Sequence, residues 1–172
     1  MASDKLAPMD FSRLNVRRTV LGGLGALLLV VSVLFLPWFT LTDTPERAES
    51  NSWVCGTDDF SCTGFETFPI LRWLLLAAAL APGILAWIIV RGHKLTWPPG
   101  EVTMVVGFTA TVLIGYNGLL DKPAPDDGLE FGTSLAWGYW VALLSAIAIA
   151  ATGFLRSSEE RGPVQRKAPG TV

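Results

Sequence analysis

The chain has 172 residues, of which 51% are hydrophobic and only 16% are charged, and its mean hydropathy is +0.45. A composition this apolar excludes an ordinary soluble domain of the same length and indicates a protein of the lipid bilayer. The net charge is only −2, and no basic patch with interleaved aromatic residues occurs in the sequence. Nucleic acid is therefore not an expected partner.

Apolar runs long enough to span a membrane follow one another along the chain. A helix needs about 20 residues to cross a hydrocarbon core of about 30 Å. The first run follows Arg17 and Arg18, but it is longer than the core of a usual signal peptide and lacks a small-residue cleavage site, so we expect it to be retained. The predicted spans are residues 20–39, 69–90, 102–120 and 135–155.

Basic residues gather beside alternate ends of these spans. Segment 1–19, the connection between the second and third spans, and tail 156–172 together hold ten Lys and Arg residues, whereas connections 41–68 and 121–134 hold two. Because Lys and Arg near helix ends remain in the cytoplasm, both termini are predicted to be cytoplasmic and the two acidic connections to face outward from a plasma membrane. The polar tail 156–172 is predicted to be disordered.

These observations predict an all-α integral membrane protein in which residues 20–155 form a four-transmembrane-helix antiparallel bundle. Small residues four apart indicate close helix contacts in lipid, and Pro82 with Gly83 predicts a kink in the second span. The expected contact residues are Gly138, Ala142, Ala146 and Ala150 in the fourth span, Gly107, Thr111 and Gly115 in the third, and Gly22 and Ala26 in the first. The tryptophans expected at the membrane interface are Trp38, Trp73, Trp97, Trp137 and Trp140.

Both cysteines of the chain, Cys55 and Cys62, lie in the first outward connection, where thiols meet an oxidising environment. A zinc site would need two further ligands, and the only histidine, His93, is predicted on the opposite side of the membrane. The spacing also differs from the Cys-x-x-Cys pattern of redox sites. We therefore expect a disulfide that staples the first extracellular loop and stabilises it by about 2.5 kcal/mol.

Ionisable residues inside a membrane usually mark transport or catalysis, and Arg72 is the one such residue in the predicted spans. Its side chain can reach the interface or pair with Glu66 or Asp121. With Tyr116 and Asn117 it would line a small polar vestibule, although an interface anchor and a single interhelical hydrogen bond explain Arg72 and Asn117 as well. The spans contain no catalytic residue set, so no catalytic residue, cofactor or enzymatic activity is expected.

Acidic residues of the two outward connections would hold a hard cation such as calcium if the connections touch. Their spacing matches no calcium loop, so a solvated acidic surface is the favoured interpretation and no metal site is predicted. The residues concerned are Asp58, Asp59, Asp126, Asp127 and Glu130.

The sequence resembles the claudin-type tetraspan layout in several features. Residues 36–39 give the first span an aromatic end, Trp53 precedes the cysteine pair, and four helices leave both tails inside. In that family the tryptophan and the two cysteines stabilise an extracellular sheet that mediates cell contact. Connection 41–68 is short for such a sheet and Cys55 lies close to Cys62, so the resemblance is one of plan.

Residues 17–155 are also similar to small uncharacterised four-helix integral membrane proteins of high-GC, actinobacterial-type bacteria. The similarity lies in the Leu-Pro-Trp end of the first span, an aromatic lead-in to the second, and the sequence Gly-Leu-Glu-Phe-Gly at 128–132 before the fourth. This resemblance implies a bacterial origin and a fold, and it implies no activity.

Together these patterns favour a non-catalytic multi-pass protein that acts in interaction, assembly or envelope organisation. Its expected partners are the lipid bilayer and either another membrane or envelope protein or a second copy of the chain. One alternative is a channel or carrier component that uses the vestibule at Arg72, Tyr116 and Asn117. A second alternative is an envelope sensor that uses the acidic outer connections.

Overall fold

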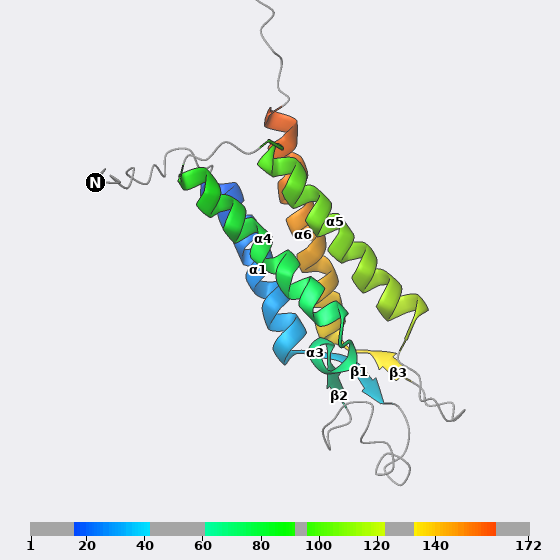
Figure 1. The fold of residues 1–172 in the computed structure, drawn as a ribbon. Coiled ribbons are helices and arrows are strands. Elements are labelled where there is room, and N and C mark those ends of the chain that lie inside the picture. The colour runs from blue at the N-terminus through cyan, green and yellow to red at the C-terminus, as the bar shows by residue number, and fades with distance from the viewer. Residues whose placement is uncertain (1–15, 42–60, 92–95, 123–132, 161–172) are drawn as a thin grey trace, which may run out of the picture.

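A computed structural model describes residues 16–41, 61–91, 96–122 and 133–160. Most of this part of the chain is helical, and the long helices run side by side with a small sheet at one end (Figure 1). We call this end of the bundle the sheet end. The long helices are α1 (Val16–Phe35), α4 (Leu71–Val90), α5 (Pro99–Gly115) and α6 (Trp137–Glu160).

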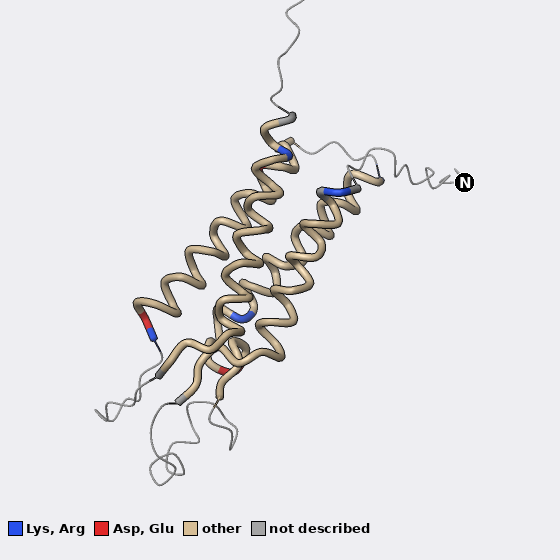
Figure 2. The backbone as a smooth tube through the Cα atoms, turned by 180° about the vertical axis from the view of Figure 1, so that it is seen from behind, with Lys and Arg blue, Asp and Glu red and all other residues tan. Residues whose placement is uncertain are grey.

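Three helical segments are long and apolar enough to cross a membrane, namely Leu71–Val90, Pro99–Leu120 and Trp137–Ser158. A shorter apolar helical stretch, Thr19–Phe35, lies in α1. Figure 2 shows that the charged residues of the described chain gather near the ends of the helices, while the long middle of the bundle is almost free of them. Both findings agree with the membrane protein that the composition predicts.

The first helix begins and ends four residues earlier than the predicted span. The predicted span continues to Phe39, whereas α1 ends at Phe35 and Pro37–Leu41 forms strand β1. Pro37 explains the difference, because proline disfavours helical backbone at the residue before it and has no amide hydrogen to donate. The apolar pattern of this segment could not separate the end of a helix from the start of a buried strand.

Strand β1 is the centre of a three-stranded antiparallel sheet with the order β2-β1-β3. Strand β2 (Ser61–Thr63) places Cys62 opposite Phe39, and strand β3 (Thr133–Leu135) places Leu135 opposite Phe39 on the other side. The sequence patterns did not predict this sheet. The sheet joins two parts of the chain. Strands β1 and β2 lie on either side of segment 42–60 of the first predicted outward connection, and β3 leads into α6.

Several helix boundaries also differ from the predicted ones. A short helix α3 (Gly64–Thr67) precedes α4, and Thr63 and Glu66 form a capping box at its start. Helix α5 begins at Pro99, since proline is tolerated in a first helical turn, and it continues as a π-helical turn, Tyr116–Leu120. Helix α6 continues to Glu160, so the first residues of the predicted disordered tail are helical.

Helix α6 lies between α1 and α5 and has its most extensive contact with α5, while α4 packs mainly on α1 (Figure 1). The predicted small-residue face of α6 is confirmed at Gly138, Ala142 and Ala146, which are buried, whereas Ala150 is only partly buried. Pro82 lies inside α4, which continues as one helix to Val90.

The backbones of α5 and α6 touch where glycine is present. A Cβ atom added at Gly107 would collide with the backbone of Ala150, and one added at Gly153 would collide with the backbone of Met104. The predicted face of α5 is only partly right, because Gly115 faces open space. The face of α5 that is buried consists of Gly100, Thr103, Gly107, Ala110 and Ile114.

Candidate functional site

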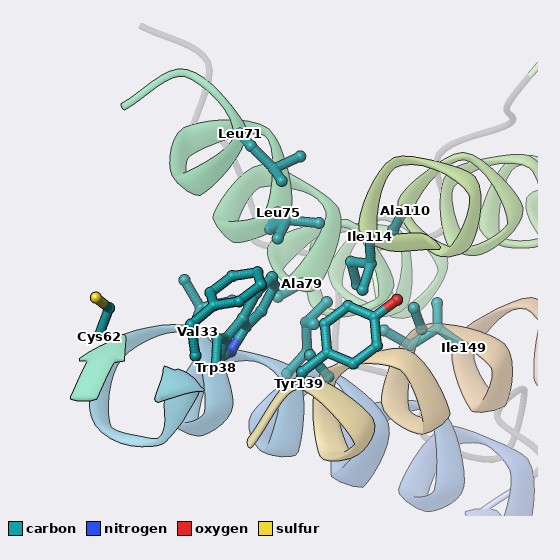
Figure 3. Close-up of a cluster of buried hydrophobic side chains, with 14 residues drawn as sticks. Val33, Trp38, Cys62, Leu71, Leu75, Ala79, Ala110, Ile114, Tyr139 and Ile149 are labelled. Atoms are coloured by element: carbon teal, nitrogen blue, oxygen red, sulfur yellow. The ribbon is translucent and has the colours of Figure 1, made fainter. Parts of the chain in front are cut away.

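The sheet end holds most of the polar and aromatic side chains that the sequence analysis singled out, so it is the candidate functional site. Its centre is Trp38, which is fully buried although an interfacial position was predicted for it. The other four tryptophans of that prediction are largely exposed: Trp73, Trp97, Trp137 and Trp140. Trp38 differs from them because β1 turns its side chain back over the ends of the helices (Figure 3).

Hydrogen bonds connect Trp38 to both α1 and α6. Its indole Nε1 donates to the carbonyl oxygen of Ser32 at 3.1 Å and to the Ser32 hydroxyl at 3.1 Å. The Ser32 hydroxyl donates in turn to the carbonyl oxygen of Gly138 at 2.6 Å. The amide of Ala136 donates to the carbonyl oxygen of Trp38 at 2.8 Å. One buried network therefore fixes the end of α1, strand β1 and the start of α6 relative to one another.

Aromatic rings fill the space around this network. Trp38 meets Tyr139 edge to face at a centroid distance of 5.9 Å and Phe68 at 6.3 Å. Phe39 meets Phe68 at 5.9 Å. Such edge-to-face pairs add about 0.5–1.5 kcal/mol each beyond the burial of apolar area. A Cβ atom added at Gly64 would lie 2.6 Å from the Trp38 ring, so the cluster requires glycine at that position.

Tyr139 is fully buried, and its hydroxyl has no hydrogen-bond partner among the described residues. Its ring lies against Gly118 of the π-helical turn, where any Cβ atom would collide with it. Figure 3 shows the ring between Trp38 and Ile149 of α6, with Ile114 of α5 above it. No sequence signal predicts this contact, because neither Tyr139 nor Gly118 belongs to a recognisable motif.

Arg72 contacts a carbonyl group and two aromatic rings. Its Nη1 donates to the carbonyl oxygen of Phe65 at 3.3 Å, and its Cζ lies 4.6 Å from the centroid of the Phe65 ring and 5.6 Å from that of Trp73. The carboxylate of Glu66, one of its two predicted partners, instead accepts from the Thr63 amide at 3.0 Å and the Thr63 hydroxyl at 2.9 Å. Arg72 therefore resembles the aromatic-stacked anchor that the sequence analysis gave as one alternative.

Tyr116 and Asn117 lie in the π-helical turn that follows α5. The Tyr116 side chain is exposed, and the amide Nδ2 of Asn117 donates to the carbonyl oxygen of Leu113, one turn earlier in its own helix, at 2.8 Å. This bond is within one helix, whereas the sequence analysis offered an interhelical one. Among the described contacts, Arg72 meets Phe65 and Trp73 and Asn117 meets Leu113, and none joins two members of the predicted vestibule. The vestibule therefore remains a prediction.

Cys62 is buried in β2, whereas Cys55 lies outside the described residues, so the pairing of the two cysteines remains a prediction. The acidic residues considered as cation ligands also lie outside the described residues. They are Asp58, Asp59, Asp126, Asp127 and Glu130. The described part of the chain contains no group of three His, Cys, Asp or Glu side chains that would hold a metal ion.

The buried hydroxyl groups of the serine and threonine residues in the bundle donate to backbone carbonyls, whereas the buried Tyr139 hydroxyl has no hydrogen-bond partner among the described residues. Thr103 donates to Pro99 at 2.9 Å, Ser145 to Val141 at 2.7 Å and Ser157 to Phe154 at 2.9 Å, each within its own helix. Ser32 is the exception, because its acceptor lies on another helix. In the described part of the chain the Tyr139 hydroxyl and the Arg72 Nε are buried without a hydrogen-bond partner, and the core cluster between the helices is otherwise apolar. The described interior therefore offers a packed core in place of a continuous polar path.

Comparison of the chain with protein-family models, with curated proteins and with solved structures gives no match. The candidate site is therefore interpreted from its geometry alone.

Proposed function

We propose that the protein is a non-catalytic, four-span plasma-membrane protein that acts in interaction, assembly or envelope organisation through its outward face. One observation carries this proposal: with the exception of Tyr139, the buried hydroxyl groups of the described bundle are bonded to backbone carbonyls, and apolar side chains fill the space between the helices. A channel or carrier needs inward polar groups or a wet pore to lower the cost of moving a polar solute through hydrocarbon.

The proposal counts α1 as the fourth span. Its apolar face packs on α6 and α4, and Gly25 approaches Ile149 of α6 closely enough that an added Cβ atom would lie 3.3 Å from its side chain. The distribution of Lys and Arg supports a topology with both termini in the cytoplasm and the sheet end outside. Single cysteines at Ser50 and at Ser158, in a background without the native pair, test this topology. An impermeant maleimide should label position 50 in intact cells, and labelling of position 158 would contradict the orientation.

The sheet supports the idea that both outward connections act as one surface. Segment 42–60 leaves from β1 and returns to β2, and segment 123–132 leads into β3 of the same sheet. The anchoring points of the two connections are thereby held together. This arrangement also supports the similarity in plan to the claudin-type layout, in which an outer sheet carries the contact surface.

A disulfide between Cys55 and Cys62 is part of the proposal. It would tie segment 42–60 to β2, where Cys62 lies opposite Phe39. The intact mass under non-reducing conditions should be lower than the reduced mass by two hydrogen atoms. Replacing both cysteines with serine should loosen the first outward connection and leave membrane insertion intact, because the bilayer determines insertion of the helices. Free thiols on most freshly isolated molecules would refute the pairing.

Two measurements separate the proposed function from a channel. The purified protein in liposomes should conduct no ions above background, and a reproducible conductance that Arg72→Ala abolishes would support the channel instead. In cells, combined Asp→Asn changes at 58, 59, 126 and 127 should weaken recovery of a partner protein from native membranes. The matched control neutralises Glu159 and Glu160 at the opposite end of the bundle, and this control should leave partner recovery and membrane abundance unchanged.

A further inference from the structure

Arg72 lies in the first turn of α4, at the sheet end of the bundle. Its Nη1 donates to the carbonyl oxygen of Phe65, and its guanidinium lies over the rings of Phe65 and Trp73. These two rings also meet each other edge to face at a centroid distance of 5.9 Å. The carbonyl group and the two rings therefore hold the guanidinium in one place, although the side chain is partly exposed.

The charge of Arg72 has no anionic partner among the described residues, because its contacts there are with a carbonyl group and two rings. Glu66 is the nearest acidic residue in the sequence, and its Oε2 accepts two hydrogen bonds from Thr63 in the capping box of α3. The Nε atom of Arg72 is buried without a hydrogen-bond partner, and Nη2 has no acceptor in the described part of the chain either. Most donors of this guanidinium are thus unused.

Arg91, at the other end of the same helix, has a compensation that Arg72 lacks. It follows Val90, and its guanidinium lies 4.5 Å from the centroid of the Trp87 ring. The macrodipole of a helix is negative at the C-terminus, so α4 itself stabilises the charge of Arg91. At the N-terminus the macrodipole is positive and opposes the charge of Arg72. None of the described groups compensates Arg72, so an anion from outside the bundle would stabilise it.

The length of α4 determines which anion lies within reach. The span Leu71–Val90 has 20 residues, which give about 30 Å at a rise of about 1.5 Å per residue. The hydrocarbon core of a bilayer is also about 30 Å thick. Arg72, the second residue of the span, therefore lies at the boundary of the hydrocarbon, beside the layer of lipid phosphates. The exposed Trp73 lies at the same boundary, as interfacial tryptophans do.

The unused donors of Arg72 suit a phosphate group. Nη1 donates one hydrogen atom to Phe65 and keeps another, and Nη2 keeps both of its own. These two nitrogens can donate side by side to two phosphate oxygens, in the bidentate arrangement that arginine favours and lysine does not form. Depth alone does not distinguish Arg72, since the exposed Lys122 lies at the same end of the bundle, but the held and unpaired guanidinium does.

We propose that Arg72 binds the phosphate group of one phospholipid in the leaflet at the sheet end. This inference rests on the membrane location of α4 and is independent of the proposed interaction function. The phosphate would compensate the charge that the described bundle leaves unpaired. It would also keep one lipid beside α3 and α4 for longer than the freely exchanging lipids around the other faces.

The test uses the full-length protein in detergent micelles, with native mass spectrometry to measure how much phosphatidylglycerol stays bound. We expect the wild-type chain to retain one phosphatidylglycerol, and we expect retention to fall several-fold in Arg72→Gln. Diacylglycerol with the same acyl chains lacks the phosphate, so the wild-type chain should retain it as weakly as Arg72→Gln retains phosphatidylglycerol. Equal retention of phosphatidylglycerol by the wild-type chain and Arg72→Gln would overturn the proposal.

Two control variants separate a phosphate site from a general effect of charge. Lys122→Gln removes an exposed positive charge at the sheet end, and Arg91→Gln removes the arginine at the other end of α4. Both should leave retention of phosphatidylglycerol unchanged, and a several-fold loss in either variant would contradict a site at Arg72.

A third variant and a competitor test the chemistry of the site. Arg72→Lys keeps the charge without the bidentate geometry, so its retention of phosphatidylglycerol should lie between that of the wild-type chain and that of Arg72→Gln. Full retention in Arg72→Lys would contradict a bidentate contact. Inorganic phosphate at millimolar concentration should not displace the lipid, and displacement would show that a soluble anion is the ligand instead.

Discussion

The contact between α5 and α6 and the cluster around Trp38 both depend on glycine, but the glycines face different groups. At the α5–α6 contact, Gly107 and Gly153 lie against the backbone of the neighbouring helix. At the sheet end, Gly64 and Gly118 lie against the rings of Trp38 and Tyr139. The first region is held by dispersion between backbones, whereas the second combines ring packing with a buried hydrogen-bond network.

The difference shows how a bundle in lipid can be fixed at one end. Between helices in a membrane the hydrophobic effect contributes little, so close packing and hydrogen bonds must hold them together. The α5–α6 contact supplies packing along most of the span. The network of Ser32, Trp38 and Gly138 joins residues that are 106 positions apart and sets how α1 meets α6 at the sheet end.

The largest effect is expected from Trp38→Ala. Removal of a fully buried indole leaves a cavity and breaks the bonds to Ser32, so we expect the free energy of unfolding to fall by about 3–5 kcal/mol. Unfolding in detergent micelles, followed by circular dichroism, measures the change. Trp137→Ala removes an exposed tryptophan and is the control, which should change stability little. Equal losses in the two variants would contradict a special role for Trp38.

A smaller effect is expected at the contact between α5 and α6. Gly107→Ala places a methyl group against the backbone of Ala150 and should lower the free energy of unfolding by about 1–3 kcal/mol. Gly115→Ala introduces the same methyl group on the same helix where nothing lies within 4 Å. The same unfolding measurement should show no loss for Gly115→Ala. A similar loss in both variants would contradict the role of the backbone contact, because alanine has a higher helix propensity than glycine and should not by itself destabilise the helix.

The two buried hydroxyls at the sheet end give a third comparison. Ser32→Ala removes a bond to Gly138 and one acceptor of the Trp38 indole, so we expect a loss of about 1 kcal/mol. Tyr139→Phe removes a hydroxyl that has no partner among the described residues, so stability should be unchanged or slightly higher. A large loss from Tyr139→Phe would show that the hydroxyl has a partner in the membrane-embedded protein.

The smallest effect is expected at Arg72. Arg72→Gln removes the cation–π contacts with Phe65 and Trp73, which are worth about 0.5–1 kcal/mol at a partly exposed site. Thermal unfolding in detergent measures the loss, with Arg72→Lys as a variant that keeps the charge. Ion conductance in liposomes should stay at background in both variants, and a change in flux without a change in stability would favour the polar vestibule.

Features that depend on local composition could be predicted from the sequence. Long apolar runs have to be helical in hydrocarbon, because each backbone polar group needs a partner within the segment, and this argument identified the spans Leu71–Val90, Pro99–Leu120 and Trp137–Ser158 to within a few residues. The small-residue spacing of α6 likewise identified its contact face, because glycine and alanine four apart lie on one side of a helix.

The contacts between residues far apart in the chain could not be predicted in this way, because they depend on how the elements pack together. The apolar pattern of residues 36–41 suits a helix end and a buried strand equally, and pairing with β2 and β3 makes it a strand. The sequence predicts an interfacial position for Trp38. In the structure β1 directs its side chain into the bundle, where the Ser32 carbonyl oxygen and hydroxyl accept hydrogen bonds from the indole. In α5, Gly107 and Gly115 look equivalent in sequence, but only Gly107 meets α6, since the rotation of a helix about its own axis is set by its neighbours and not by its composition.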